Sequence, residues 1–187
     1  MKLDESIILT IHYTDKQMIA GRTLLQKTLY FLNEKLDLGI EFAAHYYGPY
    51  SASVTDTISS LCASDIITEA VETFEPFKFG VTSESRRYTY QLTSTGQTIA
   101  KSIRDRNQGE SQKVSEVLEL MKQSGIADDY KSLSVAAKMR HILTIDDKPM
   151  TSPQILDEAQ ALGWNIANRD AEAAVDFLAN MGLVSTR

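Results

Sequence analysis

The strongest constraint on the fold is the order of apolar patterns in the first 105 residues. Apolar side chains recur at helical spacing over residues 3–11, and again over residues 24–36 after Gly21. A third helical pattern, residues 54–62, follows the dipeptide Gly48-Pro49, which predicts a turn. These patterns predict three amphipathic helices, the third entered through a sharp change of chain direction.

Between the second and third helices, residues 40–47 are rich in apolar and aromatic side chains but have no helical period. We expect a short strand or an extended segment there. Ser51 or Ser53 can then cap the third helix, because a hydroxyl oxygen can accept from a free N–H of the first turn. On the apolar face of this helix, Cys62 is expected to be a small core residue and not a nucleophile.

A β-hairpin follows the third helix directly. Ile66, Ile67 and Val71 begin one strand, and residues 87–92 alternate between apolar and polar side chains as the second strand. Residues 73–85 would form a long tip. Three helices followed by a two-stranded hairpin is the order of a winged helix-turn-helix, so the fold is predicted to be mainly α within the α+β class.

A second unit is expected after residues 105–112, which contain no apolar side chain. This boundary divides the chain into a winged helix-turn-helix domain, 1–105, and a helical helix-turn-helix-like domain, 106–187. Five apolar positions of the third helix and the following strand recur near the end of the chain at a constant offset of 117. The second unit has no room for a full wing, so we expect it to be wingless.

The charge balance bears on the kind of partner. The chain has 187 residues and a formal net charge of -6. Residues 1–105 carry 10 basic and 13 acidic side chains and residues 106–187 carry 9 and 12, so each unit nets -3. Binding that depends on neutralising phosphates needs an excess of Lys and Arg, and neither unit has one.

No pattern for catalysis, metal or cofactor binding occurs in the sequence. There is no phosphate-binding glycine loop, and the three histidines lie far apart without i,i+4 spacing. A single cysteine, no leader-like start and no long apolar run predict a cytoplasmic protein that does not enter a membrane. We therefore expect no enzymatic activity and no cofactor.

Two motifs carry a family resemblance. They are Gly-Arg-Thr-Leu-Leu-Gln-Lys at residues 21–27 and His-Tyr-Tyr-Gly-Pro-Tyr-Ser at residues 45–51. The chain resembles uncharacterised prokaryotic winged-helix proteins with the same two motifs and, more distantly, the Panacea or SocA-type antitoxin domain. The resemblance extends through residues 133–138 and 159–164. It implies a fold of DNA-binding ancestry and a role in neutralising a toxin or delivering it to a protease.

The second motif has a structural and a functional interpretation. The structural one is that its tyrosines pack their rings beside the turn and keep each hydroxyl bonded. The functional one is that polar side chains converge beside the helix start as a pocket or partner surface. The residues assigned to this surface are Arg22, Lys27, His45, Tyr46, Tyr47 and Tyr50.

The sequence leaves two functions open. One is a DNA-binding regulator that acts as a homodimer. The other is a protein-interaction module of antitoxin or adaptor type that binds a cognate protein such as a toxin. DNA binding is favoured by the element order and by basic residues on the hairpin. Against it, the face of the third helix expected to be exposed, which includes Ser51, carries no Lys or Arg. The residues assigned to DNA contact are Ser51, Ser53, Thr55, Ser59, Lys78, Arg86, Arg87, Asn168 and Arg169.

Overall fold

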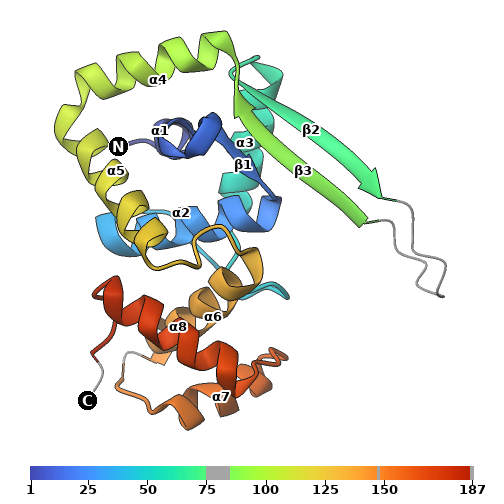
Figure 1. Cartoon of the computed structure of the whole chain (residues 1–187), viewed down its shortest axis with the longest axis vertical. Coiled ribbons are helices and arrows are strands. Elements are labelled where there is room, and N and C mark those ends of the chain that lie inside the picture. The colour runs from blue at the N-terminus through green and yellow to red at the C-terminus, as the bar shows by residue number, and fades with distance from the viewer. Residues whose placement is uncertain (75–84, 147, 186–187) are drawn as a thin grey trace.

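The computed structural model describes residues 1–74, 85–146 and 148–185. Within these ranges the chain is mainly helical and has one small antiparallel sheet of three strands (Figure 1). The predicted class, mainly α within α+β, is therefore confirmed.

The three predicted helices of the first part are present. Their bounds are Leu3–Tyr13 for α1, Arg22–Leu36 for α2 and Ala52–Ala63 for α3. One strand was not predicted: β1, Met18–Ala20, lies between α1 and α2 after a short 3₁₀ turn at Asp15–Gln17. The segment 40–47, expected to be extended or a short strand, forms only an isolated antiparallel bridge between Ala43 and Tyr50.

The predicted hairpin is confirmed as β2, Ile67–Phe74, and β3, Ser85–Leu92. The strand order is β1-β3-β2, so the short first strand pairs with the second arm of the hairpin. Figure 1 shows this hairpin extending away from the helical body. The hairpin tip, and with it the candidate DNA-contact residue Lys78, lies outside the described residues.

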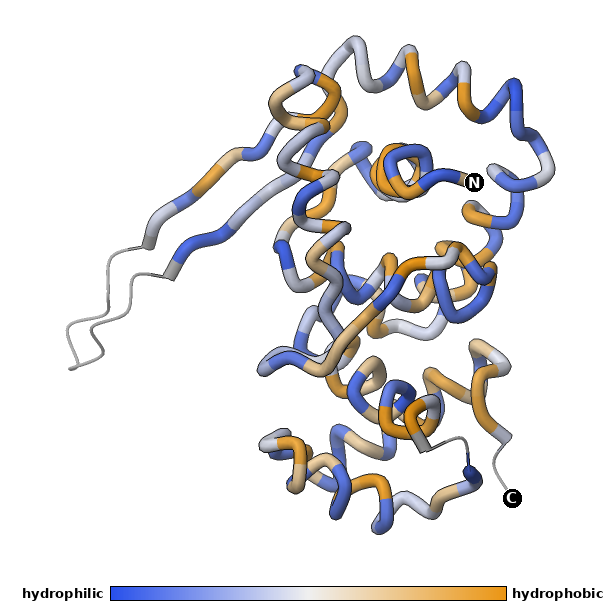
Figure 2. The backbone as a smooth tube through the Cα atoms, turned by 180° about the vertical axis from the view of Figure 1, so that it is seen from behind, coloured by the Kyte–Doolittle hydropathy of each residue, from blue (hydrophilic) through white to orange (hydrophobic). Residues whose placement is uncertain are grey.

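The polar segment 105–112 is helical except at Asn107, where α4, Ser94–Arg106, ends and α5, Gln108–Gln123, begins. Helix α5 then packs against α1, α2 and α4. In Figure 2, hydrophobic and hydrophilic residues alternate along α4, as expected for a helix with one face on the body.

The remaining helices are α6, Tyr130–Asp146, α7, Ser152–Ala161, and α8, Asn168–Asn180. Helix α6 packs against α2 on one side and against α7 and α8 on the other. The ring of Phe31 in α2 also meets that of Phe177 in α8 edge to face, with centroids 4.8 Å apart. Core side chains from residues 1–105 and 106–187 thus touch, and the division into two domains stays a prediction.

Candidate functional site

The site is centred on the loop between α2 and α3. The chain folds back on itself there, because Ala43 and Tyr50 exchange two backbone hydrogen bonds of 2.9 Å. Inside this bridge the N–H of Gly48 donates to the carbonyl of His45 at 2.8 Å, and Gly48 has a φ of 92°. Glycine is required at this turn because other side chains rarely adopt positive φ.

Gln26 of α2 fixes the start of α3. Its amide nitrogen donates to the Ser51 carbonyl at 2.9 Å, and its oxygen accepts from the Ser51 N–H at 3.0 Å. Ser51 is accordingly buried, so the expectation that it is exposed is wrong. Its hydroxyl also makes no cap to the first turn of α3 and instead bonds the hydroxyl of Ser53 at 2.9 Å.

Lys27 is buried beneath the same loop, with 2% of its surface exposed. Its ammonium donates to the carbonyl of Pro49 at 2.6 Å. Burial, with a smaller contribution from the positive charge of Lys138, lowers the pKa of Lys27 to about 7. Lys27 is therefore not part of an exposed surface. Of the two expected arrangements, a pocket or a partner surface, its burial is compatible with the pocket.

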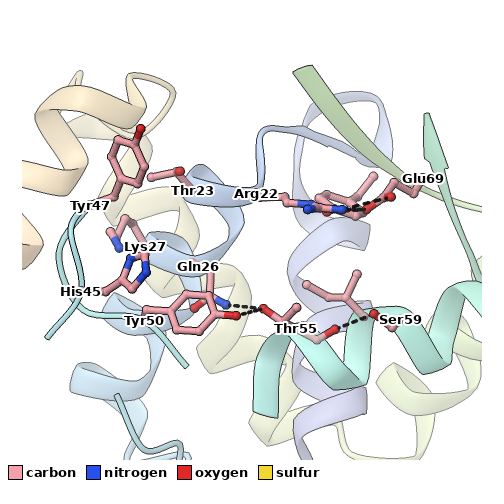
Figure 3. Close-up of a pocket in the computed structure, with 12 residues that line it drawn as sticks. Arg22, Thr23, Gln26, Lys27, His45, Tyr47, Tyr50, Thr55, Ser59 and Glu69 are labelled. Carbon is pink, nitrogen blue, oxygen red and sulfur yellow. Dashed lines mark hydrogen bonds and ion pairs between the residues drawn. The ribbon is translucent and has the colours of Figure 1, made fainter. Parts of the chain in front are cut away.

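A cavity of about 230 Å³ lies between the loop, α2, α3 and the sheet (Figure 3). It brings together five of the six residues assigned to the motif surface, and Tyr46 is the one outside it. The cavity is lined by Arg22, Thr23, Gln26, Lys27, His45, Tyr47, Tyr50, Thr55, Ile58, Ser59, Glu69 and Tyr90.

Arg22 and Glu69 occupy the sheet side of this cavity (Figure 3). The guanidinium of Arg22 lies 3.3 Å from the carboxylate of Glu69, and its Nε donates to the Tyr90 hydroxyl at 3.1 Å. That hydroxyl donates in turn to Glu69 at 2.7 Å, and the guanidinium stacks 3.5 Å from the ring centroid of Tyr88. The positive charge of Arg22 is therefore largely matched within the protein.

Tyr46 and Tyr47 point away from the core. They are 73% and 53% exposed, and their rings meet edge to face with centroids 4.9 Å apart. The structural interpretation, in which these tyrosines anchor packing, is wrong for both. It holds for Tyr50, which is half-buried, lies against the ring of His45 and shares a hydrogen bond of 2.9 Å with Thr55.

The loop is also held from the second part of the chain. The indole N–H of Trp164 donates to the carbonyl of His45 at 2.8 Å. Lys138 of α6 lies over the indole ring, 5.6 Å from its centroid, and its aliphatic chain approaches Gly48. Sequence reasoning did not assign Gln26, Glu69, Tyr90 or Trp164 to the site. Gln26 and Trp164 carried a signal, since Gln26 lies within the first motif and Trp164 within the segment 159–164 that shares the resemblance.

The candidate recognition helix α3 exposes Ser53 and Ser59, whereas Thr55 is half-buried against Gln26 and Tyr50. The hydroxyl of Ser59 donates to the Thr55 carbonyl at 3.0 Å, within the helix itself. The one charged side chain on the described face of α3 is the carboxylate of Asp56. This face offers hydroxyls and one negative charge.

The other residues assigned to DNA contact lie on separate elements. Arg86 and Arg87 are exposed on β3. Asn168 and Arg169 are exposed at the start of α8, next to Asp170, and the two views show α8 well apart from the hairpin (Figures 1 and 2). The structure does not bring these two sets together.

Among the described residues, no group of three or more His, Cys, Asp or Glu side chains is placed to hold a metal ion. Cys62 is half-buried against the core, and burial, with the nearby charge of Glu69, raises the pKa of its thiol. In the same part of the chain, no helix has the length and apolarity needed to cross a membrane.

The site thus consists of a clamped loop, two exposed tyrosines and a cavity with a buried lysine. A comparison with models of known protein families finds no match to this chain, and a comparison with curated proteins finds none either.

Proposed function

We propose that this chain is a non-enzymatic protein-interaction module of the antitoxin or adaptor type, built on a winged helix-turn-helix scaffold. The observation that carries this proposal is the exposure of Tyr46 and Tyr47 beside the cavity, on a loop that is fixed from two sides. The resemblance to the antitoxin domain, through the motif that contains both tyrosines, points in the same direction.

Exposed tyrosines on a rigid loop are suited to protein recognition. A tyrosine offers a large contact area and a polar hydroxyl while losing little conformational entropy, and tyrosine is enriched where interfaces gain most of their energy. Gln26 holds one end of this loop and Trp164 holds its middle, so little further ordering is needed on binding.

The scaffold is supported by the element order. Helix, short strand, two helices and a hairpin follow one another, and the short strand β1 pairs with β3. This is the arrangement expected of a winged helix. In a DNA-binding member, α3 would enter the major groove, yet its exposed face provides no cation for the phosphates. The proposed interface therefore lies on the loop before α3 and not on α3 itself.

The experiment is affinity purification from the native host with the wild-type chain, with Tyr46→Ala/Tyr47→Ala and with Tyr130→Ala. Tyr130 is the matched control, since it is an exposed tyrosine on α6. We expect one protein to be retained by the wild type and by Tyr130→Ala, and its recovery to fall at least tenfold with the double variant. Equal recovery by all three chains would refute the assignment of the interface.

A second candidate function, DNA binding by a symmetric dimer, is favoured by one observation. The hairpin extends from the body and exposes Arg86 and Arg87 on β3 (Figure 1). In this case the wing would supply the phosphate contacts. A gel shift with the upstream region of the gene at low salt tests the idea. Salt-sensitive binding that is lost in Arg86→Ala/Arg87→Ala would support it, and no binding by the wild type would end it.

A further inference from the structure

We propose that the cavity beside Lys27 binds the carboxylate of an acidic side chain on the partner protein. This site rests on the proposed function only for the source of that carboxylate. Lys27, His45 and Tyr47 lie together on one side of the cavity in Figure 3.

The first observation is a buried lysine without a counter-ion. Lysine is almost never fully buried unless it is paired, because removing an ammonium from water costs several kcal/mol. Lys27 has three N–H donors, and the hydrogen bond that it makes is to the neutral carbonyl of Pro49. Among the side chains that the structure describes, no carboxylate forms an ion pair with it.

The second observation is a second lysine at close range. A Cβ at Gly48 would lie 3.4 Å from Cε of Lys27 and 3.0 Å from Cγ of Lys138, so the two side chains meet at this glycine. Burial also lowers the pKa of Lys138. Two lysines in this position repel each other, and an anion at Lys27 would relieve both the repulsion and the loss of hydration.

The shape and polarity of the cavity favour a side chain over a large ligand. Its volume of about 230 Å³ lies below the roughly 300–1,000 Å³ of typical small-molecule sites. Much of its wall is formed by tyrosine rings and Ile58, which can contact the methylenes of a glutamate. The carboxylate of Glu69, at the other side, is held by Arg22 and Tyr90 and leaves Lys27 to receive the incoming charge.

The exposed tyrosines connect this cavity to the interface. Tyr47 belongs both to the cavity wall and to the exposed pair, so a partner that packs on the tyrosines lies against the cavity. A partner in this position excludes water and strengthens the interaction between Lys27 and the carboxylate. The partner that this geometry fits carries a Glu or Asp within its contact surface.

The test titrates the isotopically labelled full-length chain with N-acetylglutamate amide at pH 6.5 and follows the amide resonances of Gly48 and Ser51 by NMR. N-acetylglutamine amide and inorganic phosphate are separate arms. We expect saturable shifts with the glutamate, with a dissociation constant on the order of millimolar, and at least tenfold weaker binding of the other two. Equal binding of the glutamine probe or of phosphate overturns the proposal, as does the absence of saturation with glutamate.

Two variants locate the binding. Lys27→Met should lose at least tenfold in affinity for the glutamate probe, whereas Lys113→Met, which removes an exposed lysine on α5, should bind as the wild type does. Retained affinity in Lys27→Met overturns the proposal. If Lys27→Met does not fold, the pKa of Lys27 is measured in the wild type with and without the glutamate probe. Saturating glutamate should raise this pKa, and an unchanged pKa contradicts the assignment.

The pH dependence of binding gives an independent readout. A lysine that loses its proton near pH 7 binds a carboxylate less well above that pH, so affinity should fall roughly tenfold between pH 6.5 and pH 8. The affinity of His45→Gln should fall in the same way between these pH values. If this fall is absent in His45→Gln, the result contradicts the role of Lys27. The titratable and charged groups around Lys27 are Arg22, His45, Tyr47, Tyr50, Glu69 and Tyr90 in the cavity wall, with Lys138 and His141 of α6.

This test and that of the proposed function can fail separately. The capped amino acids are used without any partner, so binding at Lys27 is measured whether or not a partner is found. A partner that depends on Tyr46 and Tyr47 but binds Lys27→Met as tightly as the wild type would preserve the proposed function and refute the carboxylate site.

Discussion

The indole N–H of Trp164 donates to the carbonyl of His45 at 2.8 Å, across 119 positions of sequence. This bond ties the turn after α7 to the loop before α3. The candidate interface therefore depends on both parts of the chain, although all its exposed aromatic residues come from the first.

Replacing Trp164 with Phe should lower the free energy of unfolding by about 2–4 kcal/mol. The change removes a part-buried hydrogen bond, leaves the His45 carbonyl with the Gly48 N–H as its remaining donor, and reduces the packing of the buried indole beneath Lys138. Urea denaturation followed by far-UV circular dichroism measures the loss. Leu162→Ala, at an exposed position two residues earlier, should change the same free energy by less than about 0.5 kcal/mol.

Replacing Gln26 with Leu should cost about 2–4 kcal/mol of stability. Both main-chain groups of Ser51 would remain buried without their partner, and an apolar side chain cannot supply either hydrogen bond. Chemical denaturation checks the size of the effect, with exposed Gln160→Ala on α7 as the matched control. If Gln26→Leu loses as little stability as the control, the two hydrogen bonds from Gln26 to Ser51 do not have this role.

Two helical glycines should respond in opposite directions to alanine. A Cβ at Gly96 of α4 would meet the Ile66 carbonyl oxygen at 2.1 Å, so Gly96→Ala should destabilise the protein by more than about 2 kcal/mol. Nothing lies within 4 Å of a Cβ at Gly109 of α5. Gly109→Ala should therefore stabilise by up to about 1 kcal/mol. Thermal unfolding distinguishes the two, and a shift in the same direction for both contradicts the prediction.

Lys27 predicts a pH dependence of stability with a defined sign. Its pKa is 10.5 in the unfolded chain and about 7 in the folded one, so between these values the unfolded state binds more protons and stability rises with pH. Relative to Lys27→Met, the wild type should gain about 2 kcal/mol between pH 7 and pH 9. Urea denaturation at both pH values measures this difference. A constant difference would mean that Lys27 is protonated throughout this range.

The order of helices and the hairpin could be predicted from the sequence because apolar spacing reports directly on which residues face the core. Strand β1 could not, because three residues, Met18–Ala20, carry no pattern and become a strand only by pairing with β3 about 70 positions later. The burial of Lys27 also depends on tertiary packing. Helix α2 is covered by α1, α5 and α6, which buries the lysine together with its apolar neighbours.

The motif identified the right part of the molecule, but the roles of its residues depended on distant contacts. Tyr46, Tyr47 and Tyr50 are equivalent in sequence terms. Tyr50 packs against His45 and Thr55 because it lies in the bridge that closes the loop, whereas the other two lie at the tip of the turn. Lys138 and Trp164 lie in the segments 133–138 and 159–164 that share the resemblance, but nothing local to these segments indicates that they contact that loop.

We propose that Tyr46 and Tyr47 form the surface that meets a partner protein. The most direct measurement is photo-crosslinking in the native host from a photoreactive phenylalanine placed at position 46, compared with one at position 130 on α6. We expect a single covalent product with another protein from position 46 and none from position 130. No product from position 46, or the same products from both positions, would contradict it.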